Sequence, residues 1–139
     1  MPIALLLKTT GEVIPLELNN ENDHEIIRES VGGWFDCVRN HDRRIVGYVH
    51  DEGLLIGLPA NAVASFLFDQ VLAGDCVIVG SFSEAGEYDG ESHELPKAFQ
   101  SGRFVEMARD MGADVELNEK LNTLITQVDT SFTVSEWTE

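Results

Sequence analysis

Cysteine, lysine and long apolar runs are all scarce in this chain of 139 residues. The two cysteines, Cys37 and Cys76, stand far apart and form no CxxC pair, which argues against a disulfide framework or a zinc ribbon. No apolar run approaches the roughly 18 residues of a membrane span, and the first residues lack the basic stretch of a signal peptide. We therefore expect a cytoplasmic protein with two buried strand thiols. A disulfide between neighbouring strands is the alternative.

Lysine occurs only at Lys8, Lys97 and Lys120, and basic residues as a class are few. Nine lysines and arginines stand against 25 aspartates and glutamates, which gives a formal net charge of −16. Such a surface repels nucleic-acid phosphates and anionic membranes. We therefore expect no direct nucleic-acid binding and no membrane contact, and a host protein with a basic surface as the partner. A salt-adapted source, in which acidity serves only solubility, is an alternative, and a homo-oligomer remains open.

Motifs for catalysis and cofactor binding are also missing. The chain contains no GxSxG, no GxxxxGK[ST] and no strand-turn-helix GxGxxG. The run HDRR at 41–44 is a candidate for acid–base chemistry, but it falls in a predicted hairpin turn, where polar residues are expected. Glu87, Asp89 and Glu91 offer carboxylates at alternate positions but fail the EF-hand pattern. The sequence therefore predicts a non-enzymatic protein with no catalytic residue, no metal and no cofactor.

Hydrophobic periodicity predicts an α+β fold, with a mostly antiparallel sheet of five to six strands, two helices and a C-terminal helical pair. The expected domain organisation is a sheet domain over 1–82, an acidic loop over 83–96 and a helical extension over 97–139 that packs on the same domain. We expect strands at 2–9, 13–18, 34–39, 44–50, 53–58 and 74–82. We expect helices within 19–33 and 59–71, and at 104–111 and 117–128.

Four stretches in a fixed order carry a resemblance to a known family. They are "VGGWFDCVR", "GYVHDEGLLIGLPANAVA", "GDCVIVG" and the acidic "GEYDGESHELP". Over roughly residues 1–110 the chain resembles the domain-of-unknown-function family 3846, which is met mostly in phages and mobile elements of actinobacteria. The resemblance implies a non-structural accessory protein of phage type. It brings no established activity and no catalytic residues.

Carboxylates crowd the second part of the chain. On a helix, Glu106 and Asp110 are neighbours at i and i+4, which is unfavourable unless something basic binds. Trp34 and Phe35 are adjacent at the start of a strand, so one of them can be an exposed aromatic; the alternative is that the helical extension covers both. The partner-binding residues are predicted to be Glu84, Glu87, Asp89, Glu91, Glu94, Glu106, Asp110, Asp114, Glu116, Glu119 and Trp34. This surface would inhibit or regulate a basic host protein, and DNA mimicry is one possible mode.

A second class of function rests on the corner after the strand expected at 53–58. Leu58, Ala60 and Asn61 lead into a predicted helix, and region 53–66 contains no acidic residue. Amides at a helix N-terminus can hold an anion. The alternative prediction is therefore a small-ligand site for an anion or a nucleotide at Leu58, Ala60 and Asn61.

Overall fold

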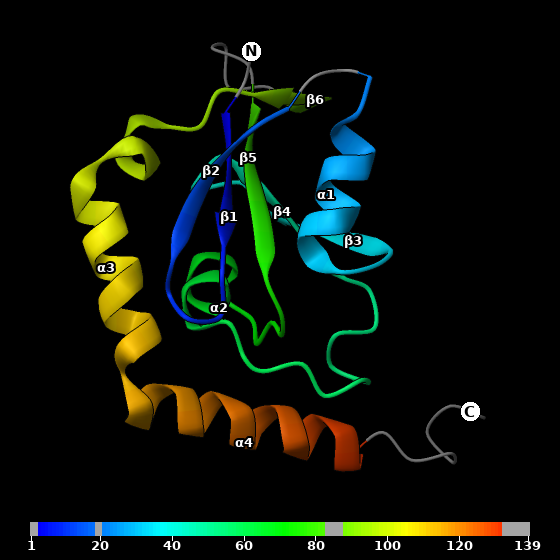
Figure 1. Cartoon of the computed structure of the whole chain (residues 1–139), viewed down its shortest axis with the longest axis vertical. Coiled ribbons are helices and arrows are strands. Elements are labelled where there is room, and N and C mark those ends of the chain that lie inside the picture. Colours follow the sequence, from blue (N-terminus) through cyan, green and yellow to red (C-terminus); the bar gives the residue numbers. More distant parts are fainter. Residues whose placement is uncertain (1–2, 19–20, 83–87, 132–139) are drawn as a thin grey trace.

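The computed structural model describes residues 3–18, 21–82 and 88–131 (Figure 1). Within these residues the predicted α+β fold is confirmed, with one six-stranded antiparallel sheet and four α-helices. The strands are β1 (Ile3–Leu7), β2 (Val13–Glu17), β3 (Phe35–Asn40), β4 (Ile45–His50), β5 (Cys76–Phe82) and β6 (Tyr88–His93). The helices are α1 (Asp23–Val31), α2 (Ala62–Phe68), the short 3-10 helix η1 (Lys97–Gln100), α3 (Gly102–Ala113) and α4 (Val115–Ser131).

The sheet has the strand order β2-β1-β5-β4-β3, with β5 at its centre. β1 and β2 form a hairpin, and Gly11 takes the positive φ of +92° that its turn requires. β3 and β4 form a second hairpin whose register pairs all six residues of each strand. This order leaves β2 and β3 at the two ends of the path.

Each face of the sheet has its own core, because side chains alternate along every strand. Leu5 and Leu7 of β1 point toward α2 and α3, where they join a cluster that includes Phe104 and Ala108. Ala4 and Leu6 point the other way and pack with α1. Figure 1 shows α1 and α3 on opposite sides of the strands.

α4 crosses one end of the molecule and closes a third, smaller core (Figure 1). Ile125 is buried with Ala60 and Ala73, and Leu121 packs at the margin of this group. The side-chain oxygen of Asn122 accepts a hydrogen bond of 2.9 Å from the backbone N–H of Ala60. The predicted C-terminal helical pair is therefore confirmed, and its second helix is attached to the segment that precedes α2.

The strand expected at 53–58 is wrong. Residues 51–57 form turns, in which the Ile56 N–H bonds to the Glu52 carbonyl at 2.9 Å and the Leu58 N–H bonds to the Gly53 carbonyl at 3.0 Å. These local bonds use the backbone groups that a ladder would need. Leu54 and Leu58, four residues apart, then pack toward α4. The apolar run indicated burial correctly but had a helical spacing rather than a strand spacing.

The loop expected over 83–96 is wrong in part, because Tyr88–His93 forms β6. β1 pairs with β5 only as far as Ile78, whereas β5 continues to Phe82. β6 pairs with β5 at Gly80 and Phe82, beyond the reach of β1. β6 therefore forms because the end of β5 has backbone groups that β1 does not reach. The polar sequence of β6 does not itself indicate a strand.

Candidate functional site

The C-terminal carboxylates are positioned by two helices that meet at Asp114. Ser101 caps the N-terminus of α3, because its hydroxyl oxygen accepts a hydrogen bond of 3.3 Å from the Phe104 N–H. Asp114 immediately precedes α4, and its carboxylate accepts a hydrogen bond of 3.0 Å from the Leu117 N–H. Asn118 fixes the junction, because its side-chain amide donates to the carbonyl oxygens of Met111 and Asp114. Asp114 therefore caps a helix in addition to contributing negative charge.

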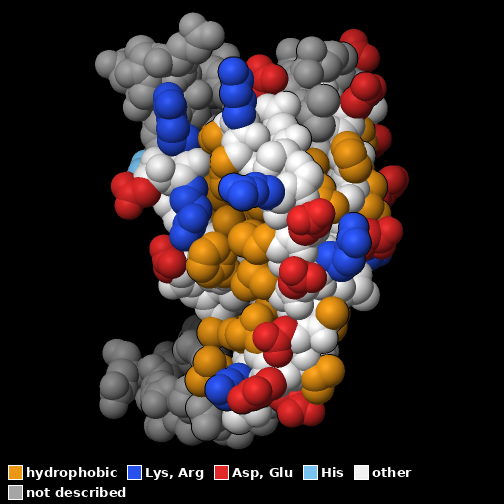
Figure 2. Space-filling view, turned by 90° about the vertical axis from the view of Figure 1, so that its left-hand side faces the viewer, with side chains coloured by type: hydrophobic (Ala, Val, Ile, Leu, Met, Phe, Trp, Pro, Cys, Tyr) orange, Lys and Arg blue, Asp and Glu red, His pale blue; other side chains and the backbone are white. Residues whose placement is uncertain are grey.

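Five of the predicted partner-binding residues are exposed around this junction, and we call them the acidic corner. The acidic corner consists of Glu106, Asp110, Asp114, Glu116 and Glu119. Figure 2 shows Asp and Glu side chains around the end of the molecule where α4 lies, beside a band of hydrophobic side chains. Glu116 lies 3.5 Å from Lys120, but both side chains are strongly exposed, so this pair contributes little to stability.

Arginines are interleaved with the carboxylates of α3. Arg103 and Arg109 are exposed on the same helix as Glu106 and Asp110, so the four charges of α3 balance. Residues at i and i+4 are about 6 Å apart along a helix axis. Negative charge therefore gathers at the end of α3 and the start of α4 rather than along the whole helix.

The remaining predicted carboxylates are placed only in part. Glu94 is exposed just after β6. Asp89 and Glu91 belong to β6, and the positions of their side chains lie outside the described residues. Glu84 and Glu87 also lie outside them.

Trp34 is an exposed aromatic, with 70% of its surface accessible. The Arg28 guanidinium of α1 lies 5.2 Å from the centre of its ring. Phe35, the next residue, is half-buried and meets Tyr48 edge to face at 5.3 Å. The two neighbouring aromatics thus differ in burial, and Trp34 lies at the start of β3, away from the acidic corner.

The residues of the predicted ligand corner have structural partners. Asn61 is fully buried; its amide donates to the carbonyls of Leu7 at 2.8 Å and Gly74 at 3.0 Å, and its oxygen accepts from the Ala64 N–H. The Ala60 N–H bonds to α4, and Leu58 packs near Ile125. The Asn61 side chain therefore caps α2 and ties it to β1, which occupies both of its N–H donors.

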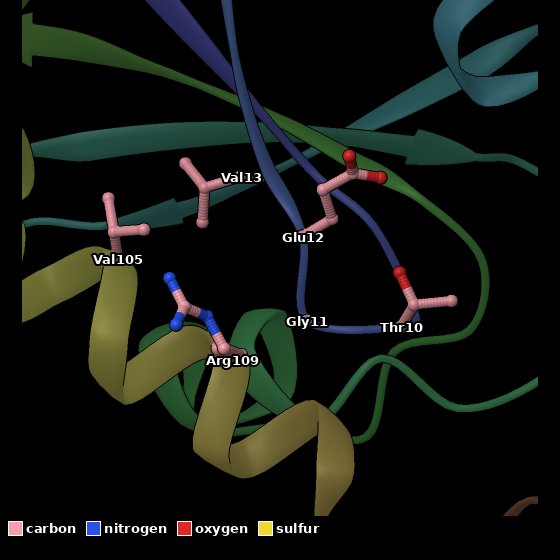
Figure 3. A pocket seen from close by; sticks show the side chains of 6 residues that line it. All are labelled: Thr10, Gly11, Glu12, Val13, Val105 and Arg109. Carbon is pink, nitrogen blue, oxygen red and sulfur yellow. The ribbon is translucent and has the colours of Figure 1, made fainter.

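A cleft that the sequence reasoning missed lies between the β1–β2 turn and α3 (Figure 3). Its volume is about 360 Å³, and it is lined by Thr10, Gly11, Glu12, Val13, Val105 and Arg109. Figure 3 shows the Arg109 side chain extending toward Val13 and Val105. The cleft is shallow and carries one cation and one carboxylate. Its walls come from segments almost 100 residues apart in the sequence, which is why no local pattern indicated it.

The expectation of two buried thiols is wrong for Cys37, which is exposed on β3, and holds for Cys76. The pKa of the Cys76 thiol is raised to about 12, chiefly by burial; a hydrogen bond with the Tyr48 backbone opposes the rise, and the charge of Asp75 adds to it. Such a thiol stays protonated and unreactive at neutral pH. Cys37 differs because its strand is at the end of the sheet path, where its side chain is exposed.

The described residues were also compared with the requirements of a metal site and of a membrane-spanning helix. In the part of the chain that the structure describes, no three His, Cys, Asp or Glu side chains are grouped so that they could hold a metal ion. None of the described helices is long and apolar enough to cross a membrane.

Comparison with known proteins identifies a family. No curated protein and no solved structure matches the chain. The family model "Domain of unknown function (DUF3846)" matches residues 3–107, which include the whole sheet and the first half of α3. Most of the acidic corner lies beyond the matched residues. Because the match covers well over half of its length, the chain belongs to the DUF3846 family.

Proposed function

We propose that this protein is a non-enzymatic accessory module that binds a basic surface of another protein through the acidic corner. The observation that carries the proposal is the meeting of α3 and α4 at Asp114, which gathers five exposed carboxylates. Glu106 and Asp110 repel each other at i and i+4. A cationic partner relieves this repulsion and is steered toward the corner by its charge.

An exposed apolar residue within the corner supports protein binding over simple solubility. Val115, between Asp114 and Glu116, has 68% of its surface accessible at the start of α4. Protein interfaces commonly combine apolar contacts with a polar rim. The corner therefore offers a small apolar contact surrounded by carboxylates, which suits a partner that presents lysines and arginines around an apolar site.

DNA mimicry is the narrower form of the proposal. B-DNA carries about one charge per 1.7 Å of its axis, whereas the carboxylates of α3 are about 6 Å apart and are interleaved with Arg103 and Arg109. Mimicry therefore requires a denser array of carboxylates than α3 provides. The family resemblance supports a phage-type regulator that acts in the host cytoplasm.

The test compares two charge reversals of equal size. One variant carries Glu106→Lys and Asp110→Lys in the corner. The control carries Glu25→Lys and Glu29→Lys, an exposed pair at the same i, i+4 spacing on α1. Each variant and the wild type are immobilised, exposed to an actinobacterial lysate, and washed at low and then high salt.

The proposal predicts a basic protein that is retained at low salt by the wild type and the α1 control and is lost from the corner variant. Release by duplex DNA would favour the mimicry form, because DNA and the corner would then occupy one site. Equal retention by all three proteins, or equal loss from both variants, would show that the corner is not the binding surface.

A further inference from the structure

The cleft between the β1–β2 turn and α3 contains a cation that forms no ion pair. Arg109 is exposed, and none of the described carboxylates pairs with it, although Glu106 precedes it by three residues on the same helix. Glu12 also lines the cleft, but Figure 3 shows its side chain pointing away from the Arg109 guanidinium. On a chain with a net charge of −16, this guanidinium is available to an anion from solution.

The backbone of Val13 adds a hydrogen-bond donor at the same place. The Lys8 N–H bonds to the Glu12 carbonyl at 2.9 Å, and these two residues continue the β1–β2 register by one step. Because hydrogen-bonded and non-hydrogen-bonded positions alternate along an antiparallel pair, the Val13 N–H points away from β1. β2 ends the sheet path, and α3 packs beside it (Figure 1). The Val13 N–H therefore points toward the side of β2 on which the cleft lies.

The walls of the cleft are apolar and fixed in position. Val13 and Val105 line it, and 37% of the Val105 surface is accessible. Gly11 lies against the backbone of α3, because a Cβ on Gly11 would be 2.5 Å from the Ala108 carbonyl oxygen. This backbone contact holds the turn against the helix, so a ligand meets a preformed site. The cleft volume of about 360 Å³ is near the lower end of the range for small-molecule sites, about 300–1,000 Å³.

We propose that this cleft binds a small monocarboxylate with a short aliphatic chain. The carboxylate accepts hydrogen bonds from the Arg109 guanidinium and from the Val13 N–H, and the aliphatic chain packs against the side chains of Val13 and Val105. Guanidinium–carboxylate pairs form short, charge-assisted hydrogen bonds, often two in parallel. A second carboxylate on the ligand would be repelled by Glu12 and by Asp110, which follows Arg109 on α3. The cleft therefore suits a single negative charge joined to an apolar group.

The first test uses isovalerate as the probe and follows the backbone amide signals of the full chain by NMR during a titration. We expect saturable shifts grouped at the residues that line the cleft, with a dissociation constant on the order of 1 mM, because so small a ligand buries little surface. Acetate lacks the aliphatic chain, and isovaleramide lacks the charge. Each should bind about tenfold or more weakly than isovalerate.

The second test compares two arginine substitutions on α3. Arg109→Gln removes the cation of the cleft and should weaken isovalerate binding about tenfold or more. Arg103→Gln is the matched control, because it makes the same change at an exposed position of the same helix, about 120° around the helix axis from Arg109. The control should bind isovalerate like the wild type. Circular dichroism checks that both variants are folded.

The absence of saturable shifts with isovalerate would overturn the proposal. So would shifts scattered over the surface, binding of acetate or isovaleramide as tight as that of isovalerate, or an equal loss in Arg109→Gln and Arg103→Gln. The proposal is separate from the acidic corner, to which neither Val105 nor Arg109 belongs. The corner variant should therefore bind isovalerate at least as tightly as the wild type, even where it fails to capture a partner protein.

Discussion

Gly11, in the β1–β2 turn, lies directly against Gly112, near the end of α3. A Cβ atom on Gly112 would be 2.4 Å from the Gly11 Cα and 2.2 Å from the Thr10 carbonyl oxygen. A Cβ on Gly11 would be 2.5 Å from the Ala108 carbonyl oxygen. Two backbones touch here without side chains between them, so the helix that leads into the acidic corner is fixed to the first hairpin of the sheet.

Gly112→Ala should therefore destabilise the protein by about 1–3 kcal/mol, the usual range for overpacking. The added methyl group meets backbone atoms, which cannot move aside as a flexible side chain would. The measurement is urea unfolding. Gly102→Ala is the matched control, because it lies in the same helix with nothing within 4 Å of the added Cβ. If both variants unfold at the same urea concentration, the close contact is not rigid.

Asn61→Ala should cost about 2–4 kcal/mol. It removes the α2 cap, usually worth about 0.5–2 kcal/mol, and leaves the buried carbonyls of Leu7 and Gly74 without this donor. Asn122→Ala, whose side chain bonds to the Ala60 N–H from an exposed position, should cost less. Denaturant unfolding of both variants measures the difference, and a larger loss for Asn122→Ala would contradict the central position of Asn61.

The Cys76 thiol makes stability depend on alkaline pH. Its pKa is raised from the ordinary 9.0 to about 12 in the folded state, so the unfolded chain loses this proton first. Its contribution is therefore complete below pH 9 and falls as pH rises toward 12, by about 1.4 kcal/mol per pH unit. Cys76→Ala should lose about 2 kcal/mol less than the wild type between pH 9 and pH 11, as measured by unfolding at each pH. Parallel pH profiles for the two proteins would show that the thiol ionises normally when folded.

Much of the fold could be predicted from the sequence, because alternation along strands such as β1 and spacing along α3 report which faces are buried. The run at 53–58 was misread because an apolar stretch between two turns does not show whether its backbone bonds locally or to a neighbour. β6 could not be predicted from its own residues, because they are polar. It forms because the end of β5 has backbone groups that β6 can pair with. Both errors concern backbone partners, which side-chain patterns do not record.

Some features of the candidate site could likewise be predicted from the sequence, and others could not. The exposure of Glu106 and Asp110 agrees with the helical spacing of the apolar residues around them. The exposure of Cys37 and the cleft at Arg109 did not follow, because each depends on which strand or turn becomes a neighbour across a long sequence distance. Strand order decides both, and this sequence has no local feature that sets it.

The most direct measurement of the proposed function is the dissociation constant of the captured partner, determined over a series of salt concentrations. It is compared among the wild type, the corner variant (Glu106→Lys, Asp110→Lys) and the α1 control (Glu25→Lys, Glu29→Lys). We predict that the corner variant binds about tenfold or more weakly, since close charge pairs across interfaces are worth at least about 1.5 kcal/mol, and that its affinity depends less on salt. The α1 control should bind like the wild type. Equal affinities and equal salt dependence in all three proteins would contradict binding through the acidic corner.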